Sequence, residues 1–271
     1  MYDFFSIVLK NGDIIYDLNT TSYEDLIEKA GVVDDTTDTD ELSFVKIAIS
    51  PNNDVFSEDW SLKIDQSIEP NWFNEEYERK CMEVFYKEVY PKCVFIGRKN
   101  LIFKNRQNLF LKDCTADLYD SSADLYASSV NLYGSSKVNL FKSSHVELFE
   151  SSQAVLHDTS SARLNGSSKA TLFNSSSADL YGSSKATLFD SSSANLYGSS
   201  WADLNNSSKA TLFDSSEANL NGSSWADLHD DATGICFSEK VSFTTLNRSV
   251  VIDRSKKGEF QIIPPNRLRR N

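Results

Sequence analysis

The sequence lacks the features that mark membrane, secreted and metal-binding proteins. No apolar run approaches the roughly 18 residues that a membrane-spanning helix needs. The N-terminal segment has no basic stretch followed by an apolar one, so it does not predict a secretory signal. Four cysteines are present without CxxC or Cys–His spacing, namely Cys81, Cys93, Cys114 and Cys236. We therefore expect a soluble cytoplasmic protein with free thiols, no membrane partner, no metal and no cofactor.

Signatures of catalysis are also missing. The chain has no P-loop, no glycine-rich dinucleotide-binding pattern and only three histidines, His145, His157 and His229, which stand far apart. Serine is abundant, but no His–Asp partner accompanies it, so nucleophilic catalysis has no support. A unique catalytic cleft would also interrupt the nearly perfect repeats described below. We expect a protein that is not an enzyme and has no catalytic residues.

The formal net charge is −12, and the charged residues are spread unevenly. Residues 1–115 hold 22 acidic and 13 basic side chains, and residues 116–232 hold 14 and 6. Residues 233–271 reverse this balance with 3 acidic and 8 basic side chains. Because nucleic-acid binding needs Lys and Arg to displace counterions, we expect no direct nucleic-acid binding by the acidic body. The acidity either keeps the protein soluble or presents a surface to a basic partner.

Residues 1–92 carry the pattern of a small α/β region. Asn11-Gly12 between two β-prone runs is the strongest short signal for a hairpin. Thr21 or Ser22 can cap the helix that follows. The expected elements are strands over 4–9 and 13–18, a helix over 23–30 that ends at Gly31, an acidic loop over 33–41, and strands over 42–50 and 60–65.

A second helix is predicted to begin after Asn74, which can cap it, and to end at Pro91. Acidic residues fill its first turn, where the helix dipole favours them. Apolar residues recur every four positions in this segment, namely Phe73, Tyr77, Cys81, Phe85 and Val89. A stripe of this width is typical of a helix face buried in a core, so we interpret it as core rather than as a binding surface.

Residues 116–232 repeat a unit of eight residues, x-A-x-L-[FYN]-x-S-S. Its Ala and Leu lie two apart, so in a strand they point to one face while the polar residues point to the other. The x-Ser-Ser that follows predicts a turn. The residue at x is mostly Gly, Asn or Asp, which tolerate a positive φ, and Ser can hydrogen-bond to nearby backbone groups. Short strands joined by such corners predict a mainly β fold, a β-solenoid, after the α/β region.

The charges that would stack on each other indicate how many octads form one coil. Side chains on successive coils lie about 4.8 Å apart, where like charges destabilise the sheet. Three octads per coil would stack Asp179, Asp203 and Asp227 in one column. Two octads per coil would instead alternate Glu147, Arg163 and Asp179. Because opposite charges opposite one another stabilise a sheet, we predict a flattened coil of two octads, about 16 residues long.

Two octads per coil have further consequences for the outer surface. Two like-charged pairs are expected, Lys169 on Lys185 and Asp214 on Asp230. Aromatic columns are expected along both corners, Phe173–Phe189 on one side and Tyr181–Tyr197–Phe213 on the other.

The solenoid is expected to begin before the clean octads, because bulkier apolar runs at 93–96, 101–103 and 109–111 keep a spacing of about eight. Apolar runs after residue 232 are expected to finish and cover its other end, and the basic residues 264–271 to leave as a tail. The expected domains are an α/β capping domain over 1–92, a β-solenoid over 93–232, and a β cap with a basic tail over 233–271.

The Tyr-Gly-Ser-Ser and Lys-Ala-Thr-Leu octads, with the segment Pro70–Phe73, resemble uncharacterised octapeptide-repeat proteins of phages, prophages and gut-associated bacteria. This resemblance covers most of the chain and implies a phage or mobile-element origin. The recurrence of Tyr181–Ser184 at 197–200 is similar to the repeats of ice-nucleation proteins, which have the same length of two octads but carry Thr-x-Thr pairs that are missing here. Ala178–Leu180 is similar to pentapeptide-repeat proteins, some of them acidic DNA mimics, although the spacing here is eight.

Together these patterns favour a non-catalytic scaffold that binds a protein partner or itself through aromatic and polar ladders. Two alternatives stay open, an acidic DNA mimic that inhibits a nucleic-acid enzyme, and an ice- or surface-templating protein. The candidate partner-binding residues are Phe173, Phe189, Tyr181, Tyr197, Phe213, Trp201, Trp225, Asp179 and Asp203.

Overall fold

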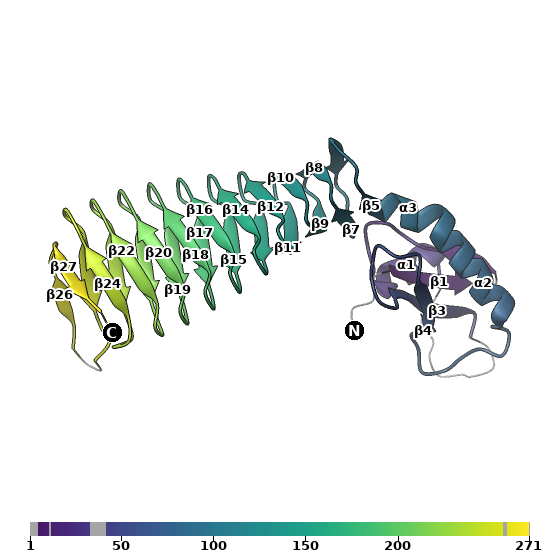
Figure 1. Ribbon diagram of the computed structural model, residues 1–271. Helices are drawn as coiled ribbons and strands as arrows, with labels where there is room; N and C mark the ends of the chain where they lie inside the picture. Colours follow the sequence, from purple (N-terminus) through teal and green to yellow (C-terminus); the bar gives the residue numbers. More distant parts are fainter. Residues whose placement is uncertain (1–4, 11, 33–41, 257–258, 271) are drawn as a thin grey trace. The chain divides into compact units, whose positions relative to one another are not determined.

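The computed structural model describes residues 5–10, 12–32, 42–256 and 259–270. The chain folds into two compact units (Figure 1). The first consists of Met1–Ile96 and Asn105–Leu111, and the second of Gly97–Lys104 and Lys112–Asn271. The predicted acidic loop over 33–41 and Asn11 of the predicted hairpin lie outside the described residues.

The first unit contains a four-stranded antiparallel sheet in the order β2-β1-β3-β4. Its strands are β1 (Phe5–Lys10), β2 (Asp13–Ile15), β3 (Phe44–Pro51) and β4 (Trp60–Ile64). Lys10 lies opposite Asp13 in the β1–β2 pair, which places a tight connection where the Asn-Gly signal predicts one. Alternating side chains of β1 enter two different cores, one on each face of the sheet.

Helix α1 (Tyr23–Ala30) covers one face, where Leu26 and Ile27 pack with Val8 and Phe44. Of the two predicted caps, Thr21 and Ser22, it is the Ser22 hydroxyl that accepts the Asp25 backbone N–H. Gly31 ends the helix with φ 61°, as the sequence predicts.

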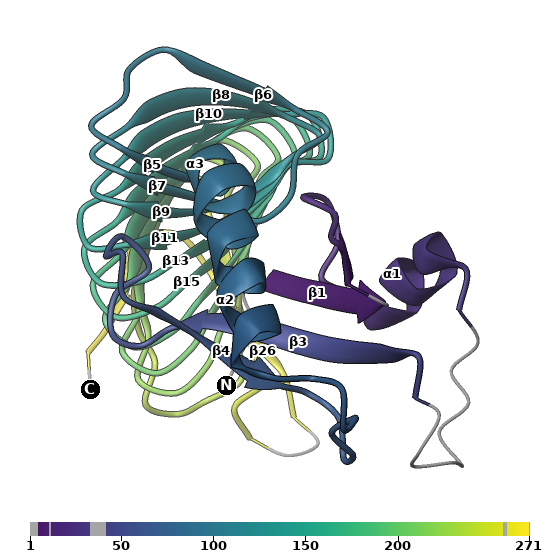
Figure 2. The ribbon, with the colours of Figure 1, turned by 90° about the vertical axis from the view of Figure 1, so that its right-hand side faces the viewer.

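The second predicted helix is three consecutive segments, α2 (Glu75–Val84), the π-helical turn η1 (Phe85–Val89) and α3 (Tyr90–Cys93). Figure 2 shows α2 beside β1, β3 and β4, with α3 continuing the helix away from them. Asn74 caps α2 as predicted, because its side chain accepts the backbone N–H groups of Glu76 and Tyr77. The aromatic stripe is core as predicted, and Phe85 packs with its ring centroid 5.0 Å from that of Trp60 and 5.5 Å from that of Phe5.

The prediction that Pro91 ends this helix is wrong. Residues four apart drift about 40° per step around a regular α-helix, so a long stripe with this spacing would leave the core. The π-helical turn takes an extra residue and opposes that drift, and Phe85, Val89 and Cys93 are all buried. Pro91 then lies in the first turn of a new helical segment, where a missing N–H costs little.

Burial also raises the pKa of the Cys81 thiol to about 12 and that of Cys93 to about 11.

The second unit is a β-solenoid of about ten turns of about 16 residues, which confirms the predicted coil of two octads. Its strands form two parallel sheets that we call the even sheet and the odd sheet. Even-sheet strands are β6 (Leu101–Lys104), β8 (Thr115–Tyr119), β10 (Ser129–Tyr133), β12 (His145–Leu148), β14 (Ser161–Leu164), β16 (Ser177–Leu180), β18 (Ser193–Leu196), β20 (Lys209–Leu212), β22 (Trp225–Leu228) and β24 (Ser242–Thr245). Odd-sheet strands are β9 (Ser122–Tyr126), β11 (Lys137–Phe141), β13 (Gln153–Leu156), β15 (Lys169–Leu172), β17 (Lys185–Leu188), β19 (Trp201–Leu204), β21 (Glu217–Leu220), β23 (Thr233–Cys236) and β25 (Val250–Asp253). Two further strands, β5 (Val94–Ile96) and β7 (Leu109–Lys112), occur in the segment where the solenoid was expected to begin.

The thin core between the two sheets is built from the second and fourth octad positions. Ala and Leu at these positions point inward and are buried, with the repeat leucines at 0% exposure. These leucines are Leu118, Leu125, Leu132, Leu140, Leu148, Leu156, Leu164, Leu172, Leu180, Leu188, Leu196, Leu204, Leu212, Leu220 and Leu228. The first and third positions therefore form the outer faces of the solenoid.

Each corner between the octads of residues 116–232 turns through one residue in the left-handed region, at the sixth octad position. Gly occupies it in several coils, but the same conformation is forced on Ala127 (φ 50°), Lys142 (φ 61°) and Glu150 (φ 58°). The serine at the eighth position is buried, and in the corner of Ser144 its hydroxyl lies 2.8 Å from the Phe141 carbonyl oxygen and 3.0 Å from that of Leu125. Five other buried serine hydroxyls have no partner among the described residues, those of Ser168, Ser184, Ser200, Ser208 and Ser224.

The parallel coils continue past residue 232 through β25, and the chain then reverses. Strand β26 (Gln261–Ile263) pairs antiparallel with β25, and β27 (Arg267–Arg269) pairs antiparallel with β24. The expectation of a free basic tail is therefore wrong for the described residues up to 270. Arg269 lies 2.7 Å from Asp253, and although burial raises the pKa of this carboxyl, hydrogen bonds from Ser255 and the Arg269 charge lower it below its usual value.

Ala127 provides a test of the corner geometry. We predict that Ala127→Gly raises the free energy of unfolding by up to about 1 kcal/mol, because glycine reaches the left-handed region without a steric cost. Urea or thermal unfolding of the purified chain measures the change. The matched control is Ala123→Gly on the adjoining strand, which loses an inward methyl and should destabilise. A lower stability of Ala127→Gly than of the wild type would contradict the account of the corner.

Candidate functional site

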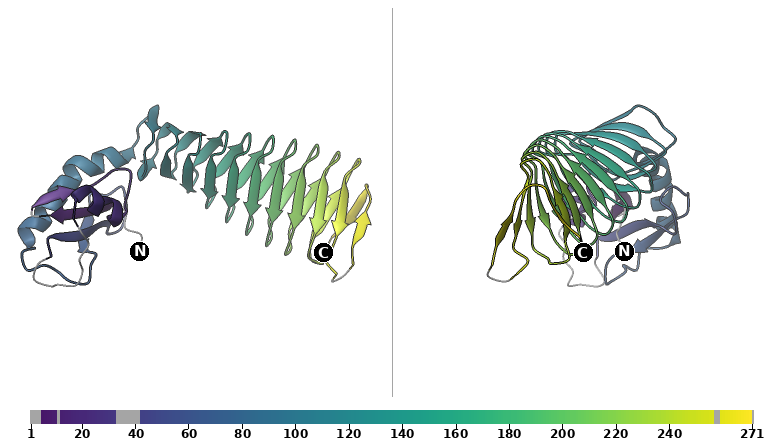
Figure 3. Two further views of the ribbon diagram at one scale, coloured as in Figure 1. Left: turned by 180° about the vertical axis from the view of Figure 1, so that it is seen from behind. Right: turned by 60° about the vertical axis from the view of Figure 1, so that its left-hand side comes forward.

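The outer faces of the solenoid are built from columns of side chains at the first and third octad positions. Each residue lies directly opposite the residue two octads away on the next coil, as in the pairs Glu147–Arg163 and Arg163–Asp179. The Arg163 guanidinium lies 3.3 Å from the Glu147 carboxylate, as expected for the predicted alternating column. Each face therefore carries two ordered rows of side chains along the stack of strands, which Figure 3 shows as ribbons.

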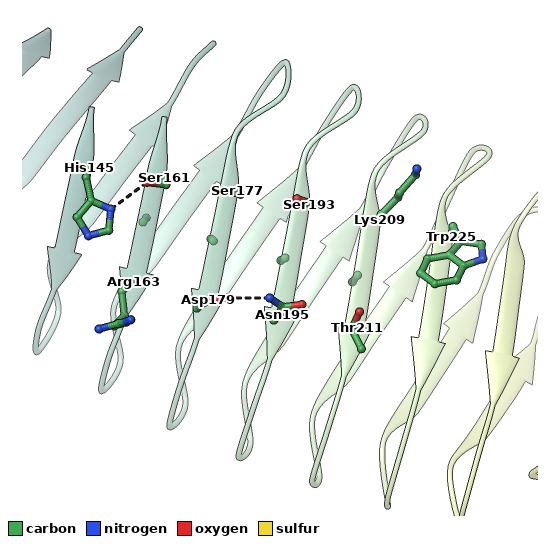
Figure 4. A pocket seen from close by; sticks show the side chains of 14 residues that line it. His145, Ser161, Arg163, Ser177, Asp179, Ser193, Asn195, Lys209, Thr211 and Trp225 are labelled. Carbon is green, nitrogen blue, oxygen red and sulfur yellow. Dashed lines mark hydrogen bonds between the residues drawn. The ribbon is translucent and has the colours of Figure 1, made fainter. Parts of the chain in front are cut away.

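A groove of about 320 Å³ runs between the two rows of the even face (Figure 4). Small serines line its middle, at 161, 177 and 193, and Trp225 closes one end beyond Lys209. At the other end the His145 ring nitrogen Nδ1 lies 2.9 Å from the Ser161 hydroxyl. The opposite row of the groove contains Arg163, Asp179, Asn195 and Thr211.

The odd face has a corresponding groove of about 320 Å³ that ends at Trp201. Lys169 and Lys185 lie along one row and Thr171 and Thr187 along the other. The Lys185 ammonium lies 6.0 Å from the centroid of the Trp201 ring, within the range of a cation–π contact.

The two grooves end in the same three residue types, Lys, Thr and Trp, because of a copy of three octads in the sequence. Residues 185–208 closely match 209–232, and three octads correspond to one and a half coils. The copy therefore appears on the opposite sheet. The odd-face quartet is Lys185, Thr187, Trp201 and Asp203, and the even-face quartet is Lys209, Thr211, Trp225 and Asp227.

The predicted aromatic columns form along the corners. Phe173 and Phe189 stack with centroids 5.1 Å apart, and Tyr197 stacks with Tyr181 at 5.0 Å and with Phe213 at 5.1 Å. All five rings are half-buried, so their faces contact one another rather than solvent. Burial, together with the nearby Asp179 charge, raises the pKa of the Tyr197 phenol.

Sequence reasoning missed two members of these columns. His157 stacks between Phe141 and Phe173, with centroid distances of 5.1 and 5.3 Å, and His229 stacks on Phe213 at 5.0 Å. Both histidines occupy the fifth octad position, so the repeat alignment itself contains the signal. Their rings extend the columns instead of forming a separate reactive site.

Carboxylates on the faces are bonded to amides on the neighbouring coil. Asn195 Nδ2 donates to Asp179 at 2.9 Å, and Asn219 Nδ2 donates to Asp203 at 2.8 Å. The pairs Asn131–Asp117 and Asn139–Asp124 repeat the arrangement at 2.8 and 2.7 Å. Burial raises the pKa of the Asp124 carboxyl. This alternation separates like charges along the columns.

Acids at the sixth octad position bond to the backbone of the preceding coil. The Asp158 carboxylate accepts the Lys142 N–H at 2.8 Å, and the Asp214 carboxylate accepts the Gly198 N–H at 2.8 Å. Asp120 bonds instead to the following coil, where hydrogen bonds from the Ser135 backbone and hydroxyl lower the pKa of its carboxyl. These carboxylates satisfy N–H groups that the sheet ladders leave open.

The nine predicted partner-binding residues do not gather in one cluster. Phe173 and Phe189 lie on one corner, and the column of Tyr181, Tyr197 and Phe213 lies on the other. Two further candidates, Trp201 and Asp203, belong to the odd face. The even face carries Asp179 and Trp225.

Within the described parts of the chain, no group of three His, Cys, Asp or Glu side chains is arranged to hold a metal ion. Of the helices that the structure describes, none is long and apolar enough to cross a membrane. None of the four cysteines forms a disulfide, and all four are buried.

No protein-family model, curated protein or solved structure matches this chain. The resemblance to phage and gut-bacterial octad proteins therefore stays an expectation about its origin.

Tyr197 tests whether the aromatic columns stabilise the solenoid. We predict that Tyr197→Leu lowers the free energy of unfolding by about 1–3 kcal/mol, because it removes two ring pairs worth about 0.5–1.5 kcal/mol each. Chemical unfolding followed by circular dichroism measures the loss. Tyr197→Phe keeps both stacks and should change stability by less than about 0.5 kcal/mol. Equal effects of the two substitutions would show that ring stacking is not what stabilises this corner.

Proposed function

We propose that this protein is a non-catalytic repeat scaffold that binds protein partners through the two outer faces of its solenoid. The observation that carries the proposal is the repetition of one quartet, Lys-Thr-Trp-Asp, on both faces. The Lys, Thr and Trp of each quartet line the end of a groove, and the Asp lies two residues after the Trp on the same strand. Each quartet therefore combines an aromatic anchor with both signs of charge. Tryptophan is the residue most enriched at energetically dominant positions of protein interfaces.

The solenoid supplies rigidity for such an interface. The backbone hydrogen bonds between coils fix the spacing of every outward residue. Binding therefore costs little entropy for ordering loops. Repeat proteins of this kind use their extended surfaces for recognition. The two quartets face opposite directions, so the scaffold is suited to hold two partner molecules at once.

The two alternative functions have less support. A DNA mimic needs free acidic columns, whereas Asp179 and Asp203 are bonded to amides and Asp158 and Asp214 to backbone N–H groups. A templating surface needs several exposed hydroxyl rows, whereas of the two corner serines the eighth-position one is buried and only the seventh-position one is exposed. A phage or mobile-element origin remains part of the proposal through the resemblance of the octads.

Substitution of the two tryptophans tests the proposal. We expect the full-length wild-type chain, immobilised on beads, to capture a discrete protein from phage-infected or gut-bacterial lysate, identified by mass spectrometry. Trp201→Ala combined with Trp225→Ala should lower the amount captured at least tenfold, because truncation of an interface anchor typically costs about 2 kcal/mol or more. Trp225→Ala alone should lower the amount captured at least twofold, because it removes the anchor of the even face.

The matched control is Ser177→Ala, which lies in the same row as Trp225 but lacks an anchor side chain. It should capture as much as the wild type. Undiminished capture by the double tryptophan variant would exclude the quartets as the binding sites.

A further inference from the structure

The odd face carries an electrostatic arrangement that the solenoid itself does not balance. Lys169 lies directly opposite Lys185 on the next coil, as the sequence predicts, and both side chains are exposed. Within the part of the chain that the structure describes, neither ammonium forms an ion pair, and the exposed Glu217 carboxylate forms none either. Two stacked like charges destabilise a sheet, so an opposite charge supplied from outside would stabilise this face.

The four residues of this row are arranged so that one copy of the face complements another. The row reads Lys169, Lys185, Trp201, Glu217 along four successive coils. A two-fold axis parallel to the strands, placed midway between β17 and β19, reverses the order of the coils in a second copy. Lys169 then faces the second copy's Glu217, and Lys185 faces the second copy's Trp201.

The same axis also brings the row of third-position residues on the odd face opposite its counterpart in the second copy. Thr187 faces the second copy's Asp203, and Val155 faces the second copy's Ile235 at the margin of the contact. Both of these margin side chains are half-buried and apolar. Every contact occurs twice, as a two-fold interface requires.

We propose that the odd faces of two copies of this chain pack together about this axis and form a dimer. The proposal rests on the function proposed above and identifies the partner of the odd face as a second copy. The even faces, with Trp225 and its groove, then point outward on both sides of the dimer. The occupant is fixed by charge complementarity, because a single chain already contains both halves of the interface.

The geometry also sets the strength of the dimer. Successive strands rotate along the solenoid (Figure 3), and two twisted sheets packed face to face stay in contact over a limited number of strands. The contact therefore lies at the small end of protein interfaces, where association is weak and depends on concentration. Because the Lys169–Glu217 ion pairs lie one coil away from the axis and are partly exposed to solvent, added salt should weaken the dimer further.

Charge reversal at Lys169 and Glu217 tests the dimer in the full-length chain. Sedimentation velocity over a range of concentrations should show the wild type passing from monomer to dimer. Lys169→Glu and Glu217→Lys should each raise the dissociation constant at least tenfold, because each puts two pairs of like charges face to face. The combined variant Lys169→Glu with Glu217→Lys should return it to within about threefold of the wild type.

Lys209→Glu is the matched control. It changes the same Lys-Ala-Thr-Leu octad on the even face and should leave dimerisation unchanged. Circular dichroism checks that every variant is folded.

A wild-type chain that stays monomeric at all concentrations, or single reversals that the combined variant does not rescue, would overturn the dimer. The function proposed above has a separate readout, since partner capture by Trp225 does not depend on dimerisation. A dimer whose tryptophan variants still capture the partner would refute that function and leave the dimer standing.

Discussion

In-register stacking of each residue on the residue two octads away is the constraint on which the rest of the solenoid depends. Backbone hydrogen bonds along both sheets join every coil to the next, and the short strands leave no room for a shift of register. The register is fixed because a slip by one residue would move the buried leucines to the solvent face. The left-handed residue at each corner then returns the chain to the other sheet within one octad.

Because of this register, the length of a copied sequence block decides on which face of the solenoid the copy lies. An octad copied two octads further along the chain stays on its own face and lengthens a column, as Phe173 and Phe189 do. A block copied three octads further along moves to the opposite face, as Trp201 and Trp225 do. The same chain thus acquired stabilising columns along its corners and two opposed quartets on its faces through copies of different length.

The coil length was predictable from the sequence because stacked side chains are direct neighbours, and like charges are unfavourable there. Glu147, Arg163 and Asp179 specify the coil of two octads, since any three-octad coil would stack aspartates. Local signals likewise identified the caps of α1 and α2, because capping is a contact within a few residues. Aligning the octads two apart also places Asp179 opposite Asn195. This pairing was missed because only charged residues were compared.

Other features depend on contacts between distant parts of the chain. The π-helical turn that carries the chain past Pro91 follows from how α2 and α3 pack on the sheet, and no local pattern marks it. Strand β27 forms from a basic segment that would be unstructured alone, because β24 offers an open edge and Asp253 a counter-charge for Arg269. The separation of the nine candidate residues over two corners and two faces follows from the coil and not from their spacing alone.

Oxidative cross-linking of introduced cysteines tests the two-octad register most directly. Ser177 and Ser193 lie directly opposite on neighbouring parallel strands, about 4.8 Å apart, within the range of Cα separations that a disulfide spans. A chain with Ser177→Cys and Ser193→Cys should form this disulfide within the monomer under mild oxidation. A chain with Ser177→Cys and Trp201→Cys, three octads apart, should not, because the two positions lie on opposite sheets. A disulfide in the second chain and none in the first would contradict the two-octad coil and the two opposed faces derived from it.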